Sequence, residues 1–342
     1  MTALRKKAEV YLEYQGYIEA APVSNQQLFA QAASNDTTTI NFWRDQWIRQ
    51  IKANHAVYGP FKDKSIASLY KKELHKPCFL LGSGPSLKKN VHLLAQHKNL
   101  GIPIVSCLHN FGFLEDLGVD VDYYVTLDAG DVVIKEVSEG GKSEEDYFAR
   151  TRGKKLLAFI GSHPNLLAKW QGEIYFFNAP VPDAPYEQAL REIEKFPLYV
   201  SSGGNVLGAC MYIAKAYLGC HTSIFLGADF CFGYGENFYS WDHELDRDLG
   251  NTIRVPDVYG IPVKTWPSYN NFKAYFDCIA QSVPGQYINC TEGGTMGAYW
   301  GGNIFSIKQM SLEQCIEHFS ISDQLKLSIE DPEGEHQFKI LF

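Results

Sequence analysis

Short apolar runs alternate with helix-like segments from about residue 76 onward, and this alternation constrains the fold most strongly. Apolar runs of strand length occur at 79–81, 103–107, 123–127, 156–160, 174–177, 222–226 and 286–289. Segments with helical spacing occur at 85–97, 111–117, 164–170, 184–195, 205–218 and 269–281. This alternation is typical of repeated strand-helix-strand units. The sequence therefore predicts an α/β fold, a doubly wound, Rossmann-like, mostly parallel sheet with helices on both faces.

Three regions follow from the pattern. Residues 1–75 carry apolar residues at helical spacing in 4–17 and 39–58, separated by the polar stretch 32–38, which predicts a helical N-terminal appendage. Residues 76–305 form the predicted main domain, with an aromatic-rich insertion at 230–267. Residues 306–342 are predicted to be a tail that packs on the core. With 342 residues, 45% of them hydrophobic, the chain can build one enlarged domain plus an appendage.

Composition excludes several classes of protein. The net charge of -8 and the lack of a dense Lys/Arg run with interleaved aromatics argue against a nucleic-acid partner. The chain has no apolar stretch long enough to span a membrane, and its first residues do not resemble a secretory signal, so we expect a cytoplasmic protein without a transmembrane segment. The eight cysteines form no C-x-x-C pair, which predicts buried thiols rather than zinc ligands or disulfides.

A glycine-rich loop directly follows the first apolar run, with the sequence GSGPSL at 82–87. Two glycines allow backbone amides to approach a ligand closely, the serines add hydroxyl groups, and proline suits the first turn of a helix. The sequence predicts a cradle for an anion or nucleotide, formed by Gly82, Ser83, Gly84, Pro85 and Ser86. An ordinary strand-to-helix turn is the alternative.

Two common glycine fingerprints do not fit the sequence. Leu87 stands where the dinucleotide fingerprint G-x-G-x-x-G requires its third glycine. The Gly-Lys-Ser triplet at 141–143 has Glu136 in place of the first glycine of a P-loop, and no apolar strand precedes it. The sequence therefore predicts neither a Rossmann dehydrogenase nor a P-loop kinase.

Other polar residues follow the carboxyl ends of the predicted strands, where doubly wound sheets bind their ligands. A second contact to phosphate or carboxylate is predicted at a helix start, from Ser202, Gly203, Gly204 and Asn205. Capping of that helix by Ser202 or Asn205 is the alternative. Five further residues are assigned to ligand binding: Asn110, Asp229, Thr291, Gly293 and Gly294.

Four residues are candidates for catalysis. His243, in the aromatic insertion, and His109, at a strand end, are rival general bases, because imidazole titrates near neutral pH. A surface position is the alternative for either histidine. Asp128 ends an apolar strand, where its carboxylate could bind a ribose hydroxyl, bind Mg²⁺ bridged to phosphates, or simply face solvent. Glu292 lies in a glycine-rich loop and is the fourth candidate.

Taken together, the strand-end motifs resemble one family. They are GSGPSL at 82–87, TLD at 126–128, SSGGN at 201–205, LGAD at 226–229 and NCTEGG at 289–294. In content, order and spacing they resemble the motility accessory factors and MptE-like 6-hydroxymethylpterin pyrophosphokinases, over about residues 76–305. The resemblance implies a transferase with a nucleotide-activated donor. One branch of the family is linked to attaching nonulosonic acids to flagellin and is similar to sialyltransferases that use CMP-sialic acid. The archaeal branch moves pyrophosphate from ATP to a pterin alcohol with Mg²⁺.

The long aromatic insertion and the N-terminal appendage favour glycosyl transfer, from a CMP-sugar to a hydroxyl of a small-molecule, glycan or protein acceptor. In that interpretation His243 or His109 deprotonates the acceptor. The alternative is an Mg²⁺-dependent pyrophosphokinase that uses ATP, with Asp128 as the metal ligand. A third hypothesis is a nucleotide sensor without catalysis. The oligomeric state stays open.

Overall fold

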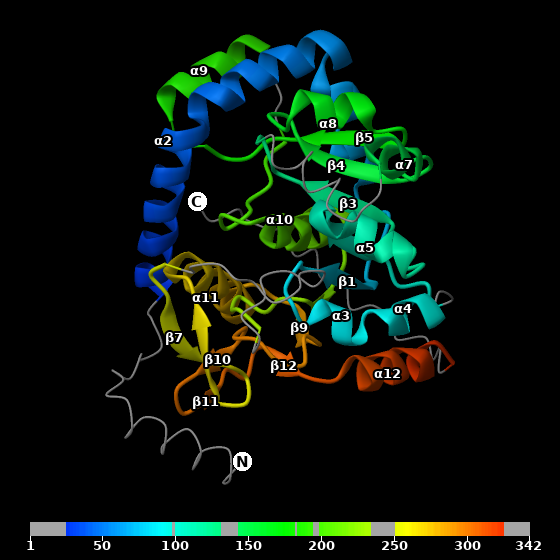
Figure 1. The fold of residues 1–342 in the computed structure, drawn as a ribbon, viewed down its shortest axis with the longest axis vertical. Coiled ribbons are helices and arrows are strands. Elements are labelled where there is room, and N and C mark those ends of the chain that lie inside the picture. The colour runs from blue at the N-terminus through cyan, green and yellow to red at the C-terminus, as the bar shows by residue number, and fades with distance from the viewer. Residues whose placement is uncertain are drawn as a thin grey trace.

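The computed structural model describes residues 25–97, 100–130, 143–181, 183–193, 198–233 and 250–324. Within them, eight parallel strands form one sheet, in the order β12-β9-β6-β1-β2-β3-β4-β5 (Figure 1). The strands are β1 (Pro77–Leu81), β2 (Ile104–Cys107), β3 (Tyr123–Thr126), β4 (Lys155–Phe159), β5 (Glu173–Phe177), β6 (Thr222–Leu226), β9 (Gln286–Asn289) and β12 (Lys308–Gln309). The predicted Rossmann-like α/β fold is confirmed.

Helices connect the strands and cover the sheet. They are α2 (Asn25–Tyr58), α3 (Leu87–Asn90), α4 (His92–Gln96), α5 (Phe111–Asp116), α7 (Glu144–Ala149), α8 (Pro164–Lys169), α9 (Ala184–Ile193), α10 (Val206–Tyr212), α11 (Pro267–Ser282) and α12 (Leu312–Gln324). Short helical turns are η1 (Phe61–Lys64), η2 (Ile66–Leu69) and η4 (Leu108–Asn110), and a π-helical segment, η5 (Ile213–Leu218), continues α10. Because helices cover the sheet, central strands such as β6 are buried along their whole length.

The strand order reverses between β1 and β6. From β1 the chain adds β2, β3, β4 and β5 in turn, then returns through α10, which packs against β1, β2 and β3. It continues with β6 on the other side of β1, followed by β9 and β12. Such a reversal opens a crevice beyond the carboxyl ends of the two strands, where α/β proteins of this kind bind ligands. The loops after β1 and β6 therefore meet at the expected binding position.

The N-terminal region differs from its prediction. The polar stretch 32–38 does not interrupt the helix, because α2 runs from Asn25 to Tyr58. This stretch contains neither glycine nor proline, and the long helix packs against α11, α8 and α9, so tertiary contacts override its weak local preference. In Figure 1, α2 rises beside α11 and then turns across the top of the molecule beside α9. Residues 4–17 lie outside the described residues.

Elements that the sequence did not indicate include strands in the insertion and at 298–303, and elements after residue 305. The insertion contains an antiparallel hairpin of β7 (Ile253–Pro256) and β8 (Pro262–Thr265), and β10 (Ala298–Tyr299) pairs with β11 (Gly302–Asn303). Beyond residue 305, β12 extends the main sheet and α12 follows. A two-residue strand such as β12 has too little periodicity to be recognised in a sequence.

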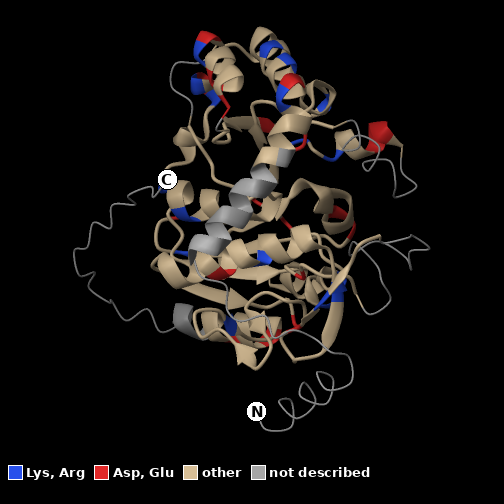
Figure 2. Ribbon diagram, turned by 90° about the vertical axis from the view of Figure 1, so that its left-hand side faces the viewer, with Lys and Arg blue, Asp and Glu red and all other residues tan. Residues whose placement is uncertain are grey.

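Some of the expectations from composition can be compared with the described residues. All eight cysteines are buried and free, as predicted. Acidic and basic residues are interspersed along the helices at the top of Figure 2. None of the described helices is both long and apolar enough to cross a membrane.

Candidate functional site

The loops after β1 and β6 pack backbone against backbone at the point where the strand order reverses. Gly82 N donates to Leu226 O at 2.8 Å, and Gly84 N donates to Gly227 O at 2.9 Å. A Cβ atom on Gly82 would lie 2.5 Å from Gly227 O, and one on Gly84 would overlap the Asp229 carboxylate. Glycine is therefore required at both positions because two chain segments cross there.

This geometry corrects part of the predicted cradle. The amides of Gly82 and Gly84 donate within the chain, so they do not point at a phosphate as the sequence analysis assigned. Pro85 and Ser86 are buried, while Ser83 and Gly84 stay partly accessible. Lys88 and Lys89, exposed on α3, follow the loop and supply positive charge that the sequence analysis missed. The position of two lysines directly after a glycine-rich loop could have indicated this positive charge from the sequence.

Asp229, in the loop after β6, forms hydrogen bonds with the loops after β1 and β9. Its Oδ2 accepts hydrogen bonds from Ser86 Oγ at 2.7 Å and from Ser86 N at 3.3 Å. Its backbone carbonyl accepts from Thr295 N at 2.8 Å and from Thr295 Oγ1 at 3.2 Å. Burial of the carboxyl raises the pKa of Asp229 to about 6, although the Ser86 hydrogen bonds oppose the shift. These contacts make Asp229 an anchor of the loops, whereas we had predicted a contact to the ligand.

The raised pKa predicts a pH-dependent contribution to stability. The folded chain holds the Asp229 proton more tightly than the unfolded chain does, so the free energy of unfolding falls as pH rises from the ordinary pKa of 3.8 to about 6. Between about pH 4.5 and about pH 7.5 this contribution falls by about 2 kcal/mol. Asp229→Asn should lack it while keeping an oxygen for Ser86. Urea unfolding of both proteins at the two pH values checks this, and an equal pH dependence would contradict it.

The loop after β9 packs against the segment that contains Asp229. Thr291 Oγ1 accepts from Ala228 N at 3.1 Å, and Gly294 O accepts from Val258 N at 2.9 Å. Thr291, Gly293 and Gly294 are buried. The structure thus places Gly294 against Asp229 and Thr291 against Ala228, with the contacts of Thr291 and Gly294 directed to neighbouring backbone.

Glu292 links this loop to two helices. Its Oε1 accepts from Asn90 Nδ2 at 2.8 Å and from Leu312 N, at the start of α12, at 2.9 Å. Its backbone has a φ of +55°, in the left-handed region that side-chain-bearing residues seldom adopt. The two hydrogen bonds hold Oε1 of the carboxylate in the fold, and the catalytic role of Glu292 stays a prediction.

The segment before α10 contains the helix cap that was left open as an alternative. Asn205 Oδ1 accepts from Gly208 N at 2.9 Å, and Ser202 Oγ accepts from Gly204 N at 3.2 Å. A Cβ atom on Gly82 would lie 3.1 Å from Leu207 Cδ2, so the first turn of α10 adjoins the Gly82 loop. Residues 201–205 remain at least partly accessible. The start of α10 therefore offers its dipole to an anion beside the loop after β1.

His109 and Asp128 form a pair at the ends of β2 and β3. His109 Nε2 lies 3.0 Å from Asp128 Oδ2, and the two side chains are 15% and 33% exposed. An ionised carboxylate can only accept, so Nε2 carries the proton and Nδ1 is the basic nitrogen of the neutral ring. The sequence predicted both residues but not their contact. The rival base, His243, lies outside the described residues.

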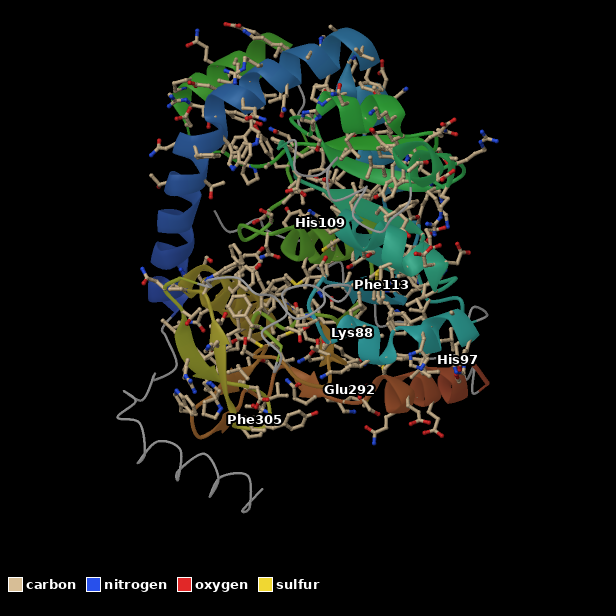
Figure 3. All side chains as sticks on the ribbon, in the orientation of Figure 1. Lys88, His97, His109, Phe113, Glu292 and Phe305 are labelled. Carbon is tan, nitrogen blue, oxygen red and sulfur yellow. The ribbon has the colours of Figure 1, made fainter. Side chains whose placement is uncertain are left out.

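Asn110 connects this pair to the loop after β1. Its Nδ2 lies 3.2 Å from Leu81 O and 3.1 Å from Gly82 O, and it also donates to Ser106 Oγ at 3.1 Å. The side chain is fully buried, so Asn110 joins the ends of β1 and β2 instead of facing a ligand as predicted. The consecutive residues His109 and Asn110 of η4 thus contact the loop after β3 and the loop after β1, respectively. Figure 3 shows His109, Lys88 and Glu292 in succession down the middle of the molecule.

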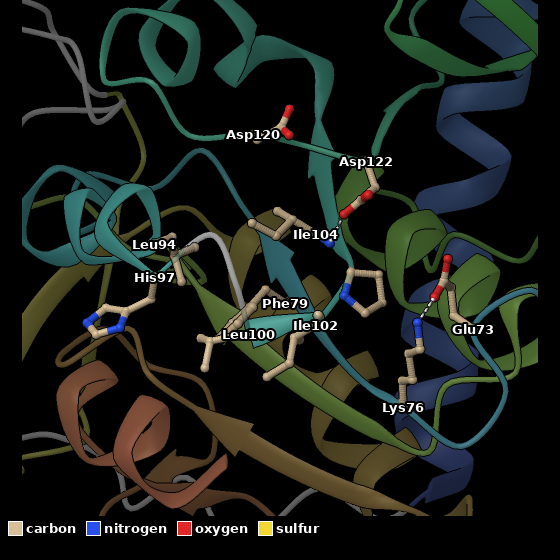
Figure 4. Close-up of a pocket in the computed structure, with 12 residues that line it drawn as sticks. Glu73, Lys76, Phe79, Leu94, His97, Leu100, Ile102, Ile104, Asp120 and Asp122 are labelled. Carbon is tan, nitrogen blue, oxygen red and sulfur yellow. Dashed lines mark hydrogen bonds and ion pairs between the residues drawn. The ribbon is translucent and has the colours of Figure 1, made fainter. Parts of the chain in front are cut away.

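A cavity of about 200 Å³ lies at the opposite edge of the sheet (Figure 4). It is lined by Lys76, just before β1, by Ile104, at the beginning of β2, and by Asp122, just before β3. Asp122 Oδ2 accepts from Ile104 N at 2.8 Å, and Glu73 pairs with Lys76 at 2.8 Å. These charged groups have partners in the fold, and the cavity is separate from the loops at the carboxyl edge.

A model of the 6-hydroxymethylpterin diphosphokinase MptE-like family matches residues 47–235, more than half of the chain. The chain belongs to this family. The match includes the loops after β1, β2, β3 and β6, together with the end of α2 from residue 47. It confirms the family inferred from the motifs. No curated protein matches the chain in sequence.

Among solved structures, the fold resembles that of the MAf glycosyltransferase from Magnetospirillum magneticum AMB-1. The TM-score is 0.51 and the sequence identity 17%, over 77% of this chain and 42% of that protein. The chain thus spans less than half of the length of that glycosyltransferase, and the likeness is one of fold.

Proposed function

We propose that this chain is a transferase with a nucleotide-activated donor, and specifically a sialyltransferase-like enzyme. It would move a sugar of the nonulosonic acid type from a CMP-sugar to an acceptor hydroxyl. The observation that carries the proposal is the His109–Asp128 pair, which lies next to the loops where the strand order reverses. A histidine oriented by a carboxylate is a common way to activate a hydroxyl.

The donor phosphate would bind between the loop after β1 and the start of α10. Ser83 and Ser202 offer accessible polar groups there, and the helix dipole favours an anion. Lys88 adds a positive charge on α3. These groups stabilise the negative charge that gathers on the phosphate as it leaves. The two glycines of the loop allow the two chain segments to pack closely.

In the transfer step, the acceptor oxygen bonds to the anomeric carbon of the sugar while the bond from that carbon to the phosphate oxygen breaks. CMP leaves with the electron pair, and the acceptor proton passes to His109 Nδ1. Asp128 holds the ring through Nε2 and stabilises the imidazolium that forms.

A second candidate is the pyrophosphokinase, which the description of the family favours. Mg²⁺ usually binds through one or two carboxylates together with substrate phosphates, and it would neutralise their charge. Asp128 fits as a single carboxylate, although its Oδ2 already contacts His109. Among the described residues, no group of three or more His, Cys, Asp or Glu could hold a metal ion. In this candidate His109 would accept the proton of the pterin alcohol.

Calorimetry with CMP, CDP and ATP, each with and without Mg²⁺, tests the proposal. We expect CMP to bind without the metal, because a single phosphate meets the helix start and Lys88. Binding of ATP that requires Mg²⁺, with no binding of CMP, would support the pyrophosphokinase instead. A nucleotide that binds with no turnover of any donor would identify a sensor, and no binding at all would contradict every candidate.

A further inference from the structure

A row of amide side chains on α2 reaches the loops after β3 and β4. Gln46 Nε2 donates to Ala129 O at 2.7 Å and Gln50 Nε2 donates to the same oxygen at 2.8 Å. One turn further, Asn54 Nδ2 donates to Ile160 O at 2.8 Å and to Ser162 O at 2.9 Å. The spacing of four residues places all three side chains on one face of the helix. This face therefore contacts the carboxyl edge of the sheet.

Two of these amides converge on one carbonyl group. One donor would satisfy the buried Ala129 oxygen, but two donors occupy both of its lone pairs. The second hydrogen bond therefore fixes the direction of the carbonyl, and with it the plane of the peptide that follows Ala129. Ala129 directly follows Asp128, the partner of His109.

The other backbone groups around Asp128 are fixed as well. Asp128 N donates to Thr126 Oγ1 at 3.2 Å, and Asp128 O accepts from His163 N at 3.1 Å. With the peptides before and after it held, the Asp128 carboxylate can turn only about its own side-chain bonds. Helix α2 holds the next peptide, through the Ala129 carbonyl, and so limits how far the backbone that carries Asp128 can shift.

Helix α2 is itself held against the domain near these glutamines. The Trp47 ring packs edge-on against Phe159 at 5.8 Å and Tyr186 at 6.2 Å between ring centres. Ile51 is buried, and Arg44 pairs with Asp183 before α9 at 3.4 Å. The helix is therefore anchored well enough to fix the atoms that its glutamines contact.

We propose that Gln46 and Gln50 are positioning residues for the His109–Asp128 pair. Their amides hold the backbone beside Asp128, so that its carboxylate stays aligned with His109 Nε2. This inference deepens the proposed function and rests on it for its catalytic meaning. The alignment itself can be measured without any turnover.

The test measures hydrogen exchange of the His109 Nε2 proton by NMR of the full chain with ¹⁵N-labelled histidine. The signal is assigned by its loss in His109→Gln. We expect exchange to rise about fivefold in Gln46→Met, and more in the double variant with Gln50→Met, because each loses a hydrogen bond of normal strength. Arg44→Met is the control, since it removes the contact of the same helix to Asp183, before α9, and leaves Ala129 untouched.

Unchanged exchange in the double variant would overturn the inference. If the double variant does not fold, the exchange rate in Gln46→Met decides the test. Gln46 is only partly buried, so we expect its single variant to fold. An equal rise in Arg44→Met would mean that the helix loosens as a whole, and would also overturn it. For the enzyme, we expect the double variant to lose turnover with its affinity for CMP unchanged. If the wild type turns over no donor, the proposed function fails while the exchange rates still decide this inference.

Discussion

Replacing His109 by Gln should lower turnover about 10²–10⁴-fold while leaving donor affinity unchanged. Glutamine keeps much of the size of the side chain, and its amide can still donate to Asp128. It cannot accept the acceptor proton near neutral pH, so the loss should fall on the chemical step. Steady-state kinetics with a CMP-sugar and calorimetry with CMP separate the two effects.

His92→Gln is the matched control, because His92 is exposed on α4 and lies outside the site. It should leave both turnover and donor affinity unchanged. The rival assignment is tested by His243→Gln in the same assay. If that variant loses turnover and His109→Gln keeps it, His243 is the base and His109 only supports the fold.

Much of the fold could be predicted because the central strands are short, apolar and buried on both faces. The apolar run predicted at 222–226 coincides with β6, and the run at 79–81 lies within β1 (Pro77–Leu81). The continuity of helix α2 was harder to predict, since its polar middle resembles a loop. This continuity comes from contacts with α11, α8 and α9. The strand β12 depends entirely on pairing with β9.

The glycines show why the site was only partly predictable. Sequence reasoning placed Gly82 and Gly84 at a strand end, and the structure confirms that position. It assigned their small size to a ligand, whereas the atoms that approach them belong to Gly227 and Asp229. A glycine that admits a ligand and one that admits a second chain segment look the same in sequence.

The pairs of the site depend on strand order, which a single sequence does not state. His109 and Asp128 come together because β2 and β3 are neighbours, and Ser86 meets Asp229 because β6 returns beside β1. Nothing in the sequence around Gln46 and Gln50 indicated that they contact the site. Glutamines four residues apart on a helix are usually found on a face that contacts solvent.

Gly84→Ala should both destabilise the chain and weaken donor binding. The added Cβ atom would overlap the Asp229 carboxylate and lie 2.7 Å from Gly227 O, so the loops after β1 and β6 have to separate. Overpacking of this kind costs about 1–3 kcal/mol, and separation of the loops moves Ser83 away from the start of α10. Urea unfolding gives the loss of stability, and calorimetry with CMP gives the loss of affinity.

A double-mutant cycle with Asp229→Ala identifies the cause. Removing the carboxylate leaves room for the new methyl group, so Gly84→Ala should cost less in the Asp229→Ala background than in the wild type. Gly112→Ala is the control, because its Cβ would meet Tyr147 at an ordinary 3.7 Å on helix α5, where alanine is favoured over glycine. Additive costs in the cycle would show that the carboxylate is not the obstacle. Unchanged affinity for CMP in a folded Gly84→Ala protein would remove the loop after β1 from the donor site.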